Sequence, residues 1–545
     1  MHNIGKQGRK LITLRKQTTA PRKGVLELEL HIQIINQALA FHTAGDLNKA
    51  LAAYDKAIAI KPDHALTHSC RGFALQQLGN HDEALAAYSR AITISPDYAE
   101  AHYNRGVALQ ELGRLEEALT AWNQAIVIKP DYISAHFNIG IALQKFGRYD
   151  EALTAFDKTI TLSHTYAEAH FNRGYVLEKL GRYEDAILAY DQAIIIKPDY
   201  ADAHLNRGVA LQALQKFEEA IFAYDQAIII KPDFASACYN KSLLLLLRGE
   251  YEDGWRLYEW RNEVEKRFAR HFEKPLLCTE NKDLRGKTAL LYSEQGLGDT
   301  IQMLRYVPLL AKHGMKIIMD GPASLHSLVR ELPGVAGTVG RGEVLPDFDL
   351  QCSLMSLPLA FKTKVETIPN AVPYLKTPNS KVTLWKDRLG IKTRPRIGLV
   401  WSGGTAHFKD RERSIPLAML LPLLDKNAEF HSIQKEYRDT DKELLAIHED
   451  RLRDHSKEIV DFGDTAAIIE EMDLVISVDT AVAHLAGALG KPVWILLPYE
   501  PDFRWLINRE DSPWYPTARL FRQSSVHDWK SVIATVKSAL LEQIC

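Results

Sequence analysis

The first half of the chain repeats one pattern of apolar and polar positions every 34 residues. Small residues, prolines and aromatic residues recur at fixed places, as in the series Tyr54, Tyr88, Trp122, Phe156, Tyr190 and Tyr224. His164 takes the place of one proline and Gln215 that of one glycine. Small residues let two helices approach closely, and proline ends a helix. The pattern predicts pairs of short helices over residues 31–268, with the aromatic filling the gap between neighbouring pairs.

This period and these positions resemble the tetratricopeptide repeat. The resemblance covers residues 31–268, with six good copies and a degenerate seventh. The seventh copy, residues 235–268, has Gly254 in place of the recurring alanine and is rich in aromatics ("YEDGWRLYEWR"), as expected of a capping unit. The resemblance implies an α-helical superhelix.

One asparagine also recurs with the repeat, at Asn104, Asn138, Asn172, Asn206 and Asn240. Asparagine is a poor helix former, because its side chain competes for backbone hydrogen bonds. In the repeat family this position lies on the inner face of the superhelix. Each amide offers a donor and an acceptor, so a ladder of them could bind the backbone of an extended peptide. The alternative is that duplication copied a harmless residue.

From Lys287 onward, short apolar segments alternate with helical stretches. Strands are predicted at 288–293, 316–320, 348–353, 396–401, 430–434, 474–478 and 493–497. Such alternation is typical of parallel sheets. A linker near residues 372–385 separates two sets, which predicts two Rossmann-like lobes over residues 269–376 and 377–545. Ligands of such sheets bind outside the carboxyl ends of the strands.

Three loops at predicted strand ends carry chemistry suited to a diphosphate. They are Glu294–Asp299 ("EQGLGD"), Ser402–Gly404 and the pair Asp479–Thr480. Glycines allow the backbone to approach a ligand, and the free amides of a helix N-terminus attract anions. Arg411 and Arg413, with Lys409, could neutralise phosphate charge.

Three segments resemble glycosyltransferase family 9, the heptosyltransferases. "DLVISVDTAVAHLAGALGKPVWILLP" resembles the donor-site segment of that family, and "GLVWSGG…RERSIP" resembles the first strand and loop of its donor lobe. "SEQGLGDTIQMLRYVPLL" resembles the N-terminal motif whose aspartate is the proposed base. The match covers roughly residues 285–500, and the tail "WYPTARLFRQ" resembles proteins that fuse such repeats to a transferase. The resemblance implies a GT-B fold of two facing α/β lobes.

Carried onto this chain, the resemblance makes Asp299 the catalytic base, with Glu294 as its rival. Donor binding is expected from Ser402, Gly403, Gly404, Arg413, Asp479, Thr480, Ala481 and His484. Ala481 departs from the glycine of the family motif. Asp479 could instead be a plain helix cap, since Asp and Thr both cap helices well, and its expected role is structural or toward ribose hydroxyls. His484 could equally be a core residue, and His407 is an open candidate. Because no H-E-x-x-H, D-x-D or paired-carboxylate signature occurs, no metal or other cofactor is invoked.

Composition restricts the alternatives. With 545 residues the chain needs several domains, and its 69 acidic residues nearly balance its 67 Lys and Arg, which argues against nucleic acid as a partner. Residues 1–30 begin with a basic stretch and are expected to form a disordered tail. No apolar run reaches membrane-spanning length, and five scattered cysteines predict a reducing, cytoplasmic compartment.

Together these features predict a glycosyltransferase that moves a sugar from a nucleoside diphosphate sugar to an acceptor hydroxyl, with inversion. The repeats are expected to bind a protein or peptide acceptor, by analogy with other proteins that join such repeats to a GT-B fold. One alternative is a repeat scaffold with an inactive transferase half. Another is a different GT-B enzyme, such as a nucleotide-sugar epimerase or a phosphorylase.

Overall fold

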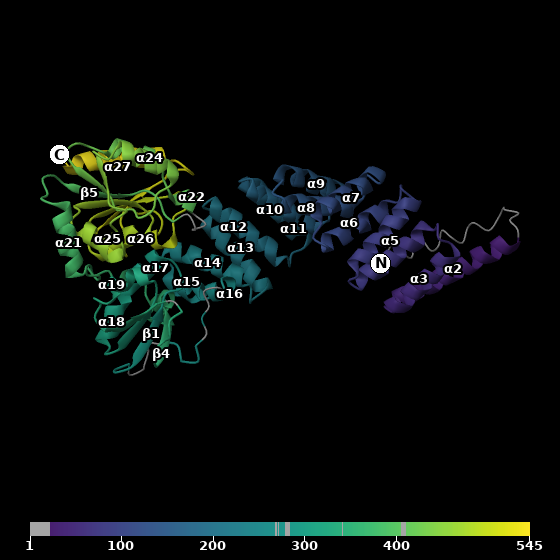
Figure 1. Cartoon of the computed structure of the whole chain (residues 1–545), viewed down its shortest axis with the longest axis horizontal. Helices are drawn as coiled ribbons and strands as arrows, with labels where there is room; N and C mark the ends of the chain where they lie inside the picture. The colour runs from purple at the N-terminus through teal and green to yellow at the C-terminus, as the bar shows by residue number, and fades with distance from the viewer. Residues whose placement is uncertain are drawn as a thin grey trace. The chain divides into compact units, whose positions relative to one another are not determined.

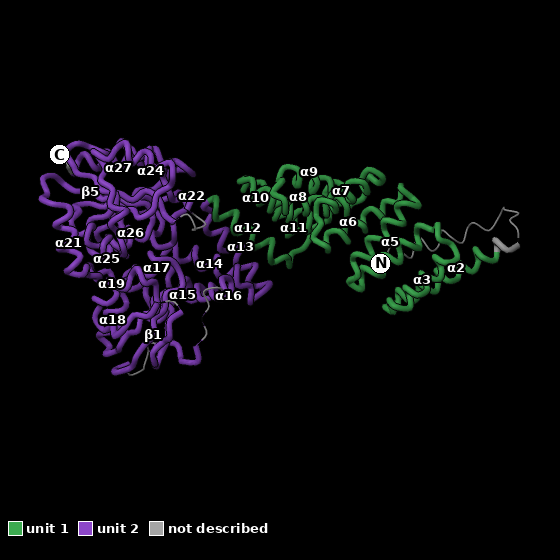
Figure 2. The backbone as a smooth tube through the Cα atoms, viewed as in Figure 1, with its two compact units in different colours: residues 1–214 green, residues 215–545 purple. Residues whose placement is uncertain are grey.

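The computed structural model describes residues 22–266, 270, 272–277, 284–340, 342–404 and 410–544. The chain forms two compact units, residues 1–214 and 215–545 (Figure 2). Residues 1–21 of the predicted basic tail lie outside the described residues. The last part of that prediction is wrong, because helix α2 begins at Arg22 and runs to Thr43.

Unit 1 consists of the predicted repeat helices. After α2 come α3 (Leu47–Ile60), α4 (Ala65–Gln77), α5 (His81–Ile94), α6 (Ala99–Glu111), α7 (Leu115–Ile128), α8 (Ile133–Lys145), α9 (Tyr149–Leu162), α10 (Ala167–Lys179), α11 (Tyr183–Ile196) and α12 (Ala201–Ala213). Unit 2 opens with four more helices, α13 (Phe217–Ile230), α14 (Ala235–Arg248), α15 (Tyr251–Tyr258) and α16 (Arg261–Val264). The predicted helical repeats are confirmed.

The recurring aromatic packs inside a helix pair. A Cβ added at Gly140 of α8 would lie 2.6 Å from the ring of Phe156 on α9, and one at Gly174 of α10 equally close to Tyr190 on α11. These glycines therefore leave the space that the ring fills. The prediction placed the ring between neighbouring pairs. In the structure the ring packs between the two helices of its own pair. Phe156 also belongs to a core cluster that includes residues of the neighbouring pairs.

The turns between paired helices need a left-handed residue. There, φ lies between 72° and 80° at Gly45, Gly79, Gly113, Gly147 and Gly181. Gln215 takes the same conformation, with φ 57°, where the glycine series is interrupted. A histidine series steadies the other connection: His68, His102, His136, His170 and His204 each place Nε2 2.9–3.2 Å from the carbonyl oxygen six residues earlier.

Two parallel sheets form the rest of unit 2. The four-stranded sheet has the order β3-β2-β1-β4, and the six-stranded sheet the order β10-β9-β8-β5-β6-β7. Their strands are β1 (Thr288–Tyr292), β2 (Lys316–Asp320), β3 (Val335–Val339), β4 (Leu350–Ser353), β5 (Arg396–Val400), β6 (Glu429–Ser432), β7 (Leu452–Asp454), β8 (Leu474–Val478), β9 (Val493–Leu497) and β10 (Ala518–Arg522). Sequence patterns missed β3, β7 and β10, which lie toward the sheet edges.

Short helices connect these strands. The four-stranded lobe carries α17 (Leu297–Met303), α18 (Val307–Lys312), α19 (His326–Val329) and α20 (Leu357–Ala360), and α21 (Asn379–Leu389) leads to the other lobe. The six-stranded lobe carries α22 (Asp410–Arg413), α23 (Leu417–Leu420), α24 (Asp439–Ile447), α25 (Phe462–Glu470), α26 (Ala481–Ala488) and α27 (Trp529–Ile544). Single 3-10 turns lie between them: η2 (Leu304–Tyr306), η3 (Ala323–Leu325), η4 (Leu354–Ser356), η5 (Val365–Thr367), η6 (Leu421–Leu423) and η7 (Phe503–Trp505).

The predicted linker near 372–385 is partly helical. Helix α21 begins inside it, and Trp385 of that helix is fully buried and donates from Nε1 to Asp464 Oδ1 at 2.9 Å. Helical repeats followed by two parallel α/β lobes are the predicted fold class, which is confirmed. Figure 1 shows α17 and α26 between the two sheets, where they pack against each other.

Candidate active site between the two sheets

The strand order of the six-stranded sheet defines one crevice. Sequence order runs β5, β6, β7 in one direction and β8, β9, β10 in the other, so the reversal lies between the neighbours β5 and β8. Parallel α/β sheets bind ligands outside the carboxyl ends of strands at such a point. The loops that follow these two strands are Ser402–Gly404 and Asp479–Thr480. Two of the three predicted loops thus meet at the expected place.

The side chain of Gln434 holds the loop after β5 in place. Gln434 accepts from the backbone N–H of Ser402 at 3.0 Å and donates to the Ser402 hydroxyl at 2.7 Å. Ser402 is 6% exposed, so its hydroxyl supports the loop. A Cβ on Gly403 would come within 2.6 Å of the Arg413 guanidinium, whereas one on Gly404 would meet nothing within 4 Å. Gly403 therefore makes room for Arg413, and Gly404 faces open space.

Arg413 joins the two loops. Its Nη1 donates to the backbone carbonyl of Asp479 at 2.9 Å, and its side chain is 19% exposed. Its Nε is buried and has no hydrogen-bond partner among the described residues. The nearest carboxylate, Asp410, lies 4.0 Å away and already binds Ser414 and Arg438. Arg413 therefore offers positive charge at the crevice.

Helix α26 starts at this crevice. Thr480 is its N-cap residue, in extended backbone conformation, and its side chain makes no capping hydrogen bond. The Thr480 hydroxyl lies 3.1 Å from the Ser477 hydroxyl instead. The N-cap position of α26 thus belongs to Thr480 and not to Asp479. Ala481 is the first residue of the helix.

Asp479 and His484 both have shifted pKa values. Burial, and then repulsion by Asp502, raises the pKa of Asp479 to about 6. Burial and the nearby Arg504 cation lower the pKa of His484 to about 3, so its ring is neutral. His484 Nε2 lies 3.7 Å from Asp479 Oδ1, and Nδ1 lies 2.9 Å from the Tyr515 hydroxyl. The ring is 4% exposed and stacks on Trp505, so it is held as a packing residue beside the crevice.

The third predicted loop comes from the other lobe and reaches the same place. A Cβ on Gly298 would lie 2.7 Å from the His484 ring, so the start of α17 touches α26 closely. Asp299 is the third residue of α17 and accepts from the backbone N–H of Gly296 at 2.7 Å. Its side chain is 21% exposed and pairs with Arg504. Motifs about 180 residues apart in sequence, around Asp299 and Asp479, therefore share one interlobe contact.

Glu294, the rival base, has a different environment. Its side chain is 1% exposed and forms an ion pair with Arg261 of α16 at 2.7 Å, and Arg261 is itself 1% exposed. Arg261 also binds Glu259 and Ser356, each at 2.7 Å. This carboxylate joins the last repeat to β1. Of the two predicted candidates for the base, Asp299 is therefore the more exposed carboxylate.

Sequence reasoning missed Arg504, on the turn η7. It binds Asp299 of the other lobe, Gln302 Oε1 at 2.7 Å and Asp502 Oδ1 at 2.5 Å. Burial opposes its charge, but Asp299 and Asp502 outweigh burial and raise the pKa of the guanidinium above its usual value. A signal was present, because η7 follows β9, and charged residues after the strands of a parallel sheet are candidates for a ligand site.

The recurring asparagines are half-buried in the repeats. Asn138 donates to the Tyr103 hydroxyl of the preceding pair at 3.3 Å, and Asn172 donates to the carbonyl of Glu168 at 2.7 Å. Asn104 and Asn206 also lie in unit 1, whereas Asn240 lies in unit 2. Where an amide N–H₂ is used locally, the amide oxygen keeps its capacity to accept a hydrogen bond.

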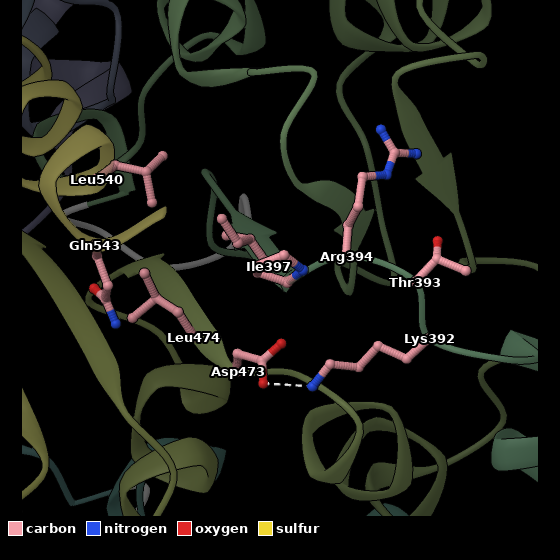
Figure 3. Close-up of a pocket in the computed structure, with 9 residues that line it drawn as sticks. Lys392, Thr393, Arg394, Ile397, Asp473, Leu474, Leu540 and Gln543 are labelled. Carbon is pink, nitrogen blue, oxygen red and sulfur yellow. Dashed lines mark hydrogen bonds and ion pairs between the residues drawn. The ribbon is translucent and has the colours of Figure 1, made fainter. Parts of the chain in front are cut away.

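A hollow of about 400 Å³ lies at the opposite, amino edge of the six-stranded sheet (Figure 3). Its two basic side chains already have partners within the chain: Lys392 pairs with Asp473 at 2.5 Å, and Arg394 donates to the carbonyl of Lys426. It is therefore separate from the crevice. His407 and Lys409, two further sequence candidates, lie outside the described residues. The described residues hold no group of three or more metal-ligating side chains, and none of their helices could span a membrane.

Comparison with known proteins finds repeat families in the first half of the chain and a glycosyltransferase family in the second. Tetratricopeptide-repeat models match residues 38–147, 137–201 and 201–234. The model of glycosyltransferase family 9 (heptosyltransferase) matches residues 460–503, which contain Asp479, Thr480 and His484. Protein FlbA of Caulobacter vibrioides is 25% identical over 324 residues, covering 54% of this chain and 52% of FlbA, so the match spans about half the length of that relative.

Similar solved structures cover the repeats. YrrB, described as a tetratricopeptide-repeat protein with an unusual peptide-binding site, is 26% identical over 35% of this chain and 98% of its own, with a TM-score of 0.33. PilF of Pseudomonas aeruginosa is 20% identical over 40% of this chain and 98% of its own, with a TM-score of 0.36. The family models thus identify tetratricopeptide repeats within residues 38–234, and a segment similar to glycosyltransferase family 9 at residues 460–503 of the α/β half.

Proposed function

We propose that this protein is a glycosyltransferase that moves a sugar from a nucleoside diphosphate sugar to an acceptor hydroxyl, with inversion at the anomeric carbon. The observation that carries the proposal is the meeting of three loops. The β5 loop and the start of α26 flank the crevice of the six-stranded sheet, and α17 of the other lobe brings Asp299 to the same point. The family 9 match covers one of these loops.

Each loop has a role in this reaction. The diphosphate binds at the crevice, with Arg413, the Thr480 hydroxyl, the α26 amides and the backbone of Ser402–Gly404 around it. Asp299 accepts the proton of the acceptor hydroxyl. The hydroxyl oxygen forms a bond to the anomeric carbon from the face opposite the diphosphate, and the bond from that carbon to the diphosphate breaks. The nucleoside diphosphate leaves with the electron pair, so stabilising charge is needed where Arg413 lies.

The environments of the two carboxylates fit these roles. Asp299 is 21% exposed, and a carboxylate with two partners keeps further lone pairs for an acceptor hydroxyl. Asp479 has a raised pKa, and bringing a diphosphate nearby would favour its neutral form further. Its repulsion of the donor is thereby reduced, and it can serve a ribose hydroxyl as predicted. No metal is required by this scheme, because Arg413 and the helix amides supply the positive charge.

The repeats supply a second binding function. Tetratricopeptide repeats suggest protein binding, and we propose that Asn104, Asn138, Asn172 and Asn206, on the expected inner face of the superhelix, bind a protein acceptor. An extended chain presents peptide groups at regular intervals, which suits amides spaced one repeat apart. We place the reaction in the cytoplasm, as the scattered cysteines predict.

A donor panel tests the proposal. Purified full-length protein is incubated with nucleoside diphosphate sugars, binding is measured by calorimetry, and release of nucleoside diphosphate is measured with and without candidate acceptors. Thr480→Val and Arg413→Ala should each weaken binding of nucleoside diphosphate by about 1–3 kcal/mol, since each loses a hydrogen bond to a charged group. Lys426→Ala, on an exposed loop of the same lobe, is the control. Unchanged affinity in both variants would exclude this donor site.

Asp299 is tested in the same assay. Asp299→Asn keeps the size of the side chain but cannot accept a proton, so turnover should fall roughly a hundredfold while donor binding stays near wild type. A scaffold without transferase activity is the second candidate, because both Asp299 oxygens already have partners, Arg504 and the Gly296 N–H. Absence of donor binding across the panel would favour that candidate.

A further inference from the structure

Arg504 connects the two lobes of unit 2, and each of its three guanidinium nitrogens donates a hydrogen bond. Its Nε donates to Gln302 and its Nη2 to Asp299, both on the four-stranded lobe. Its Nη1 donates to Asp502 on its own lobe, and the Arg504 backbone N–H donates to the same oxygen at 3.0 Å. The side chain is 7% exposed. Three separate hydrogen bonds therefore set the place of this guanidinium.

The turn that carries Arg504 is itself rigidly placed. Phe503 lies 5.7 Å from the rings of both Trp255 and Tyr258 on α15. On the other side, Trp505 stacks on His484 at 5.2 Å, and its carbonyl accepts from Arg522 at 2.7 Å. The last repeat and α26 thus hold the turn η7 from two directions.

Asp299 depends on this arrangement. One carboxylate oxygen accepts from the Gly296 N–H of its own lobe, and the other is bound by Arg504 from the opposite lobe. Without Arg504, the carboxylate would keep a single fixed contact, and its orientation toward the crevice would no longer be set across the interface. A displacement of about 1 Å can cost a factor of about a hundred in rate.

We propose that Arg504 is a positioning residue: it fixes the Asp299 carboxylate against the crevice and holds the two lobes in the register that the reaction needs. The inference deepens the proposed function and rests on it for its catalytic part. Its structural part, the interlobe connection, stands on the contacts themselves.

The first test needs no substrate. Spin labels on cysteines at Val344 and Ile391, which are 95% and 92% exposed on the two lobes, report the interlobe distance distribution in the full-length protein by pulsed electron spin resonance. The native cysteines are replaced by serine or alanine beforehand. Arg504→Gln should broaden the distribution, and Arg504→Lys should restore part of it. Arg509→Gln, which removes an ion pair with Asp511 on the same loop region, is the matched control. An unchanged distribution in Arg504→Gln would overturn the interlobe role.

The second test is a double-mutant cycle on turnover. If Arg504 acts through Asp299, Arg504→Gln should lower kcat at least tenfold in the wild-type background with little change in donor affinity, and should have almost no further effect in Asp299→Asn. Arg504→Lys should recover part of the loss. Additive losses in the double mutant would overturn the positioning role. If wild type releases no nucleoside diphosphate, the proposed function fails, and the label distances still decide the interlobe role.

Discussion

At the scale of single residues, the pKa of Asp479 is set by its surroundings in the folded protein and not by its place in a motif. Burial and Asp502 raise its pKa from 3.8 to about 6, whereas neutral His484 beside it carries no compensating charge. The folded protein thus binds the Asp479 proton more tightly than the unfolded chain does. Stability contributed by this group is present at low pH and is lost as pH rises from about 4 through about 6.

We therefore expect Asp479→Asn to stabilise unit 2 at neutral pH. A shift of about two pKa units corresponds to roughly 3 kcal/mol, which is the upper bound for the gain at pH 7.5. The difference between variant and wild type should shrink as pH falls toward 4, because the carboxyl is then protonated in the folded state and increasingly protonated in the unfolded state. Thermal unfolding followed by tryptophan fluorescence measures this. A gain that grows on acidification would contradict the assigned direction.

Gln215 allows a second residue-scale prediction. It occupies the left-handed turn conformation that glycine takes in the equivalent turns, and a side chain there costs roughly 1 kcal/mol. Gln215→Gly should therefore stabilise the protein by about 0.5–1 kcal/mol. The loss of the hydrogen bond from Gln215 to the Tyr499 carbonyl makes this gain smaller. Gly181→Ala, at the same position in another repeat, should destabilise it. Urea titration of both variants checks the opposite signs.

At the scale of elements, the last helix pair belongs physically to the α/β half. Trp514 donates to the Tyr251 hydroxyl at 3.0 Å, Gln295 donates to the Tyr258 hydroxyl at 2.9 Å, and Arg261 pairs with buried Glu294. The repeat pattern ends near residue 268, but these contacts tie α14–α16 to both lobes. A chain that begins at residue 269 would expose this aromatic surface, so the α/β half needs α14–α16 to fold well.

Arg261 tests this dependence. Arg261→Met leaves the Glu294 carboxylate buried without its partner, which costs about 3–5 kcal/mol. Arg256→Met on the neighbouring α15 breaks an ion pair in which both side chains are 66% exposed, and should cost less than about 1 kcal/mol. All tryptophans except Trp122 lie in residues 215–545, so their fluorescence during urea unfolding reports this unit. Equal losses in both variants would contradict the structural role of Arg261.

At the scale of the whole molecule, the repeats and the α/β half should act on different parts of one reaction. Replacing Asn138, Asn172 and Asn206 with Ala removes three amides of the series and raises helix propensity, so circular dichroism should stay unchanged. Transfer to a protein acceptor should fall, while donor hydrolysis without acceptor should not. Asn123→Ala, exposed on α7 outside the series, is the control. Equal sugar transfer to the protein acceptor in the triple mutant and wild type would mean that the asparagine series only reflects duplication of the repeat.

Much of this architecture could be predicted from local patterns. A 34-residue period specifies helix pairs, because each repeat meets the same neighbours. Apolar runs located β1, β2, β4, β5, β6, β8 and β9, and their carboxyl ends pointed to the loops at Ser402 and Asp479. The edge strands β3, β7 and β10 were missed, because half-exposed or very short strands lack a continuous apolar run.

The sequence by itself determined the repeats, the alternation of strand and helix, and the loops that could face a ligand, since all of these depend on residues near one another in the chain. Only the tertiary structure decided that Glu294 is sealed by Arg261 and that Asp299 is bound by Arg504, which lies 205 residues away. Periodicity reports which face of an element is buried. It does not show which distant side chain contacts a given residue, because that partner depends on how the two sheets pack together.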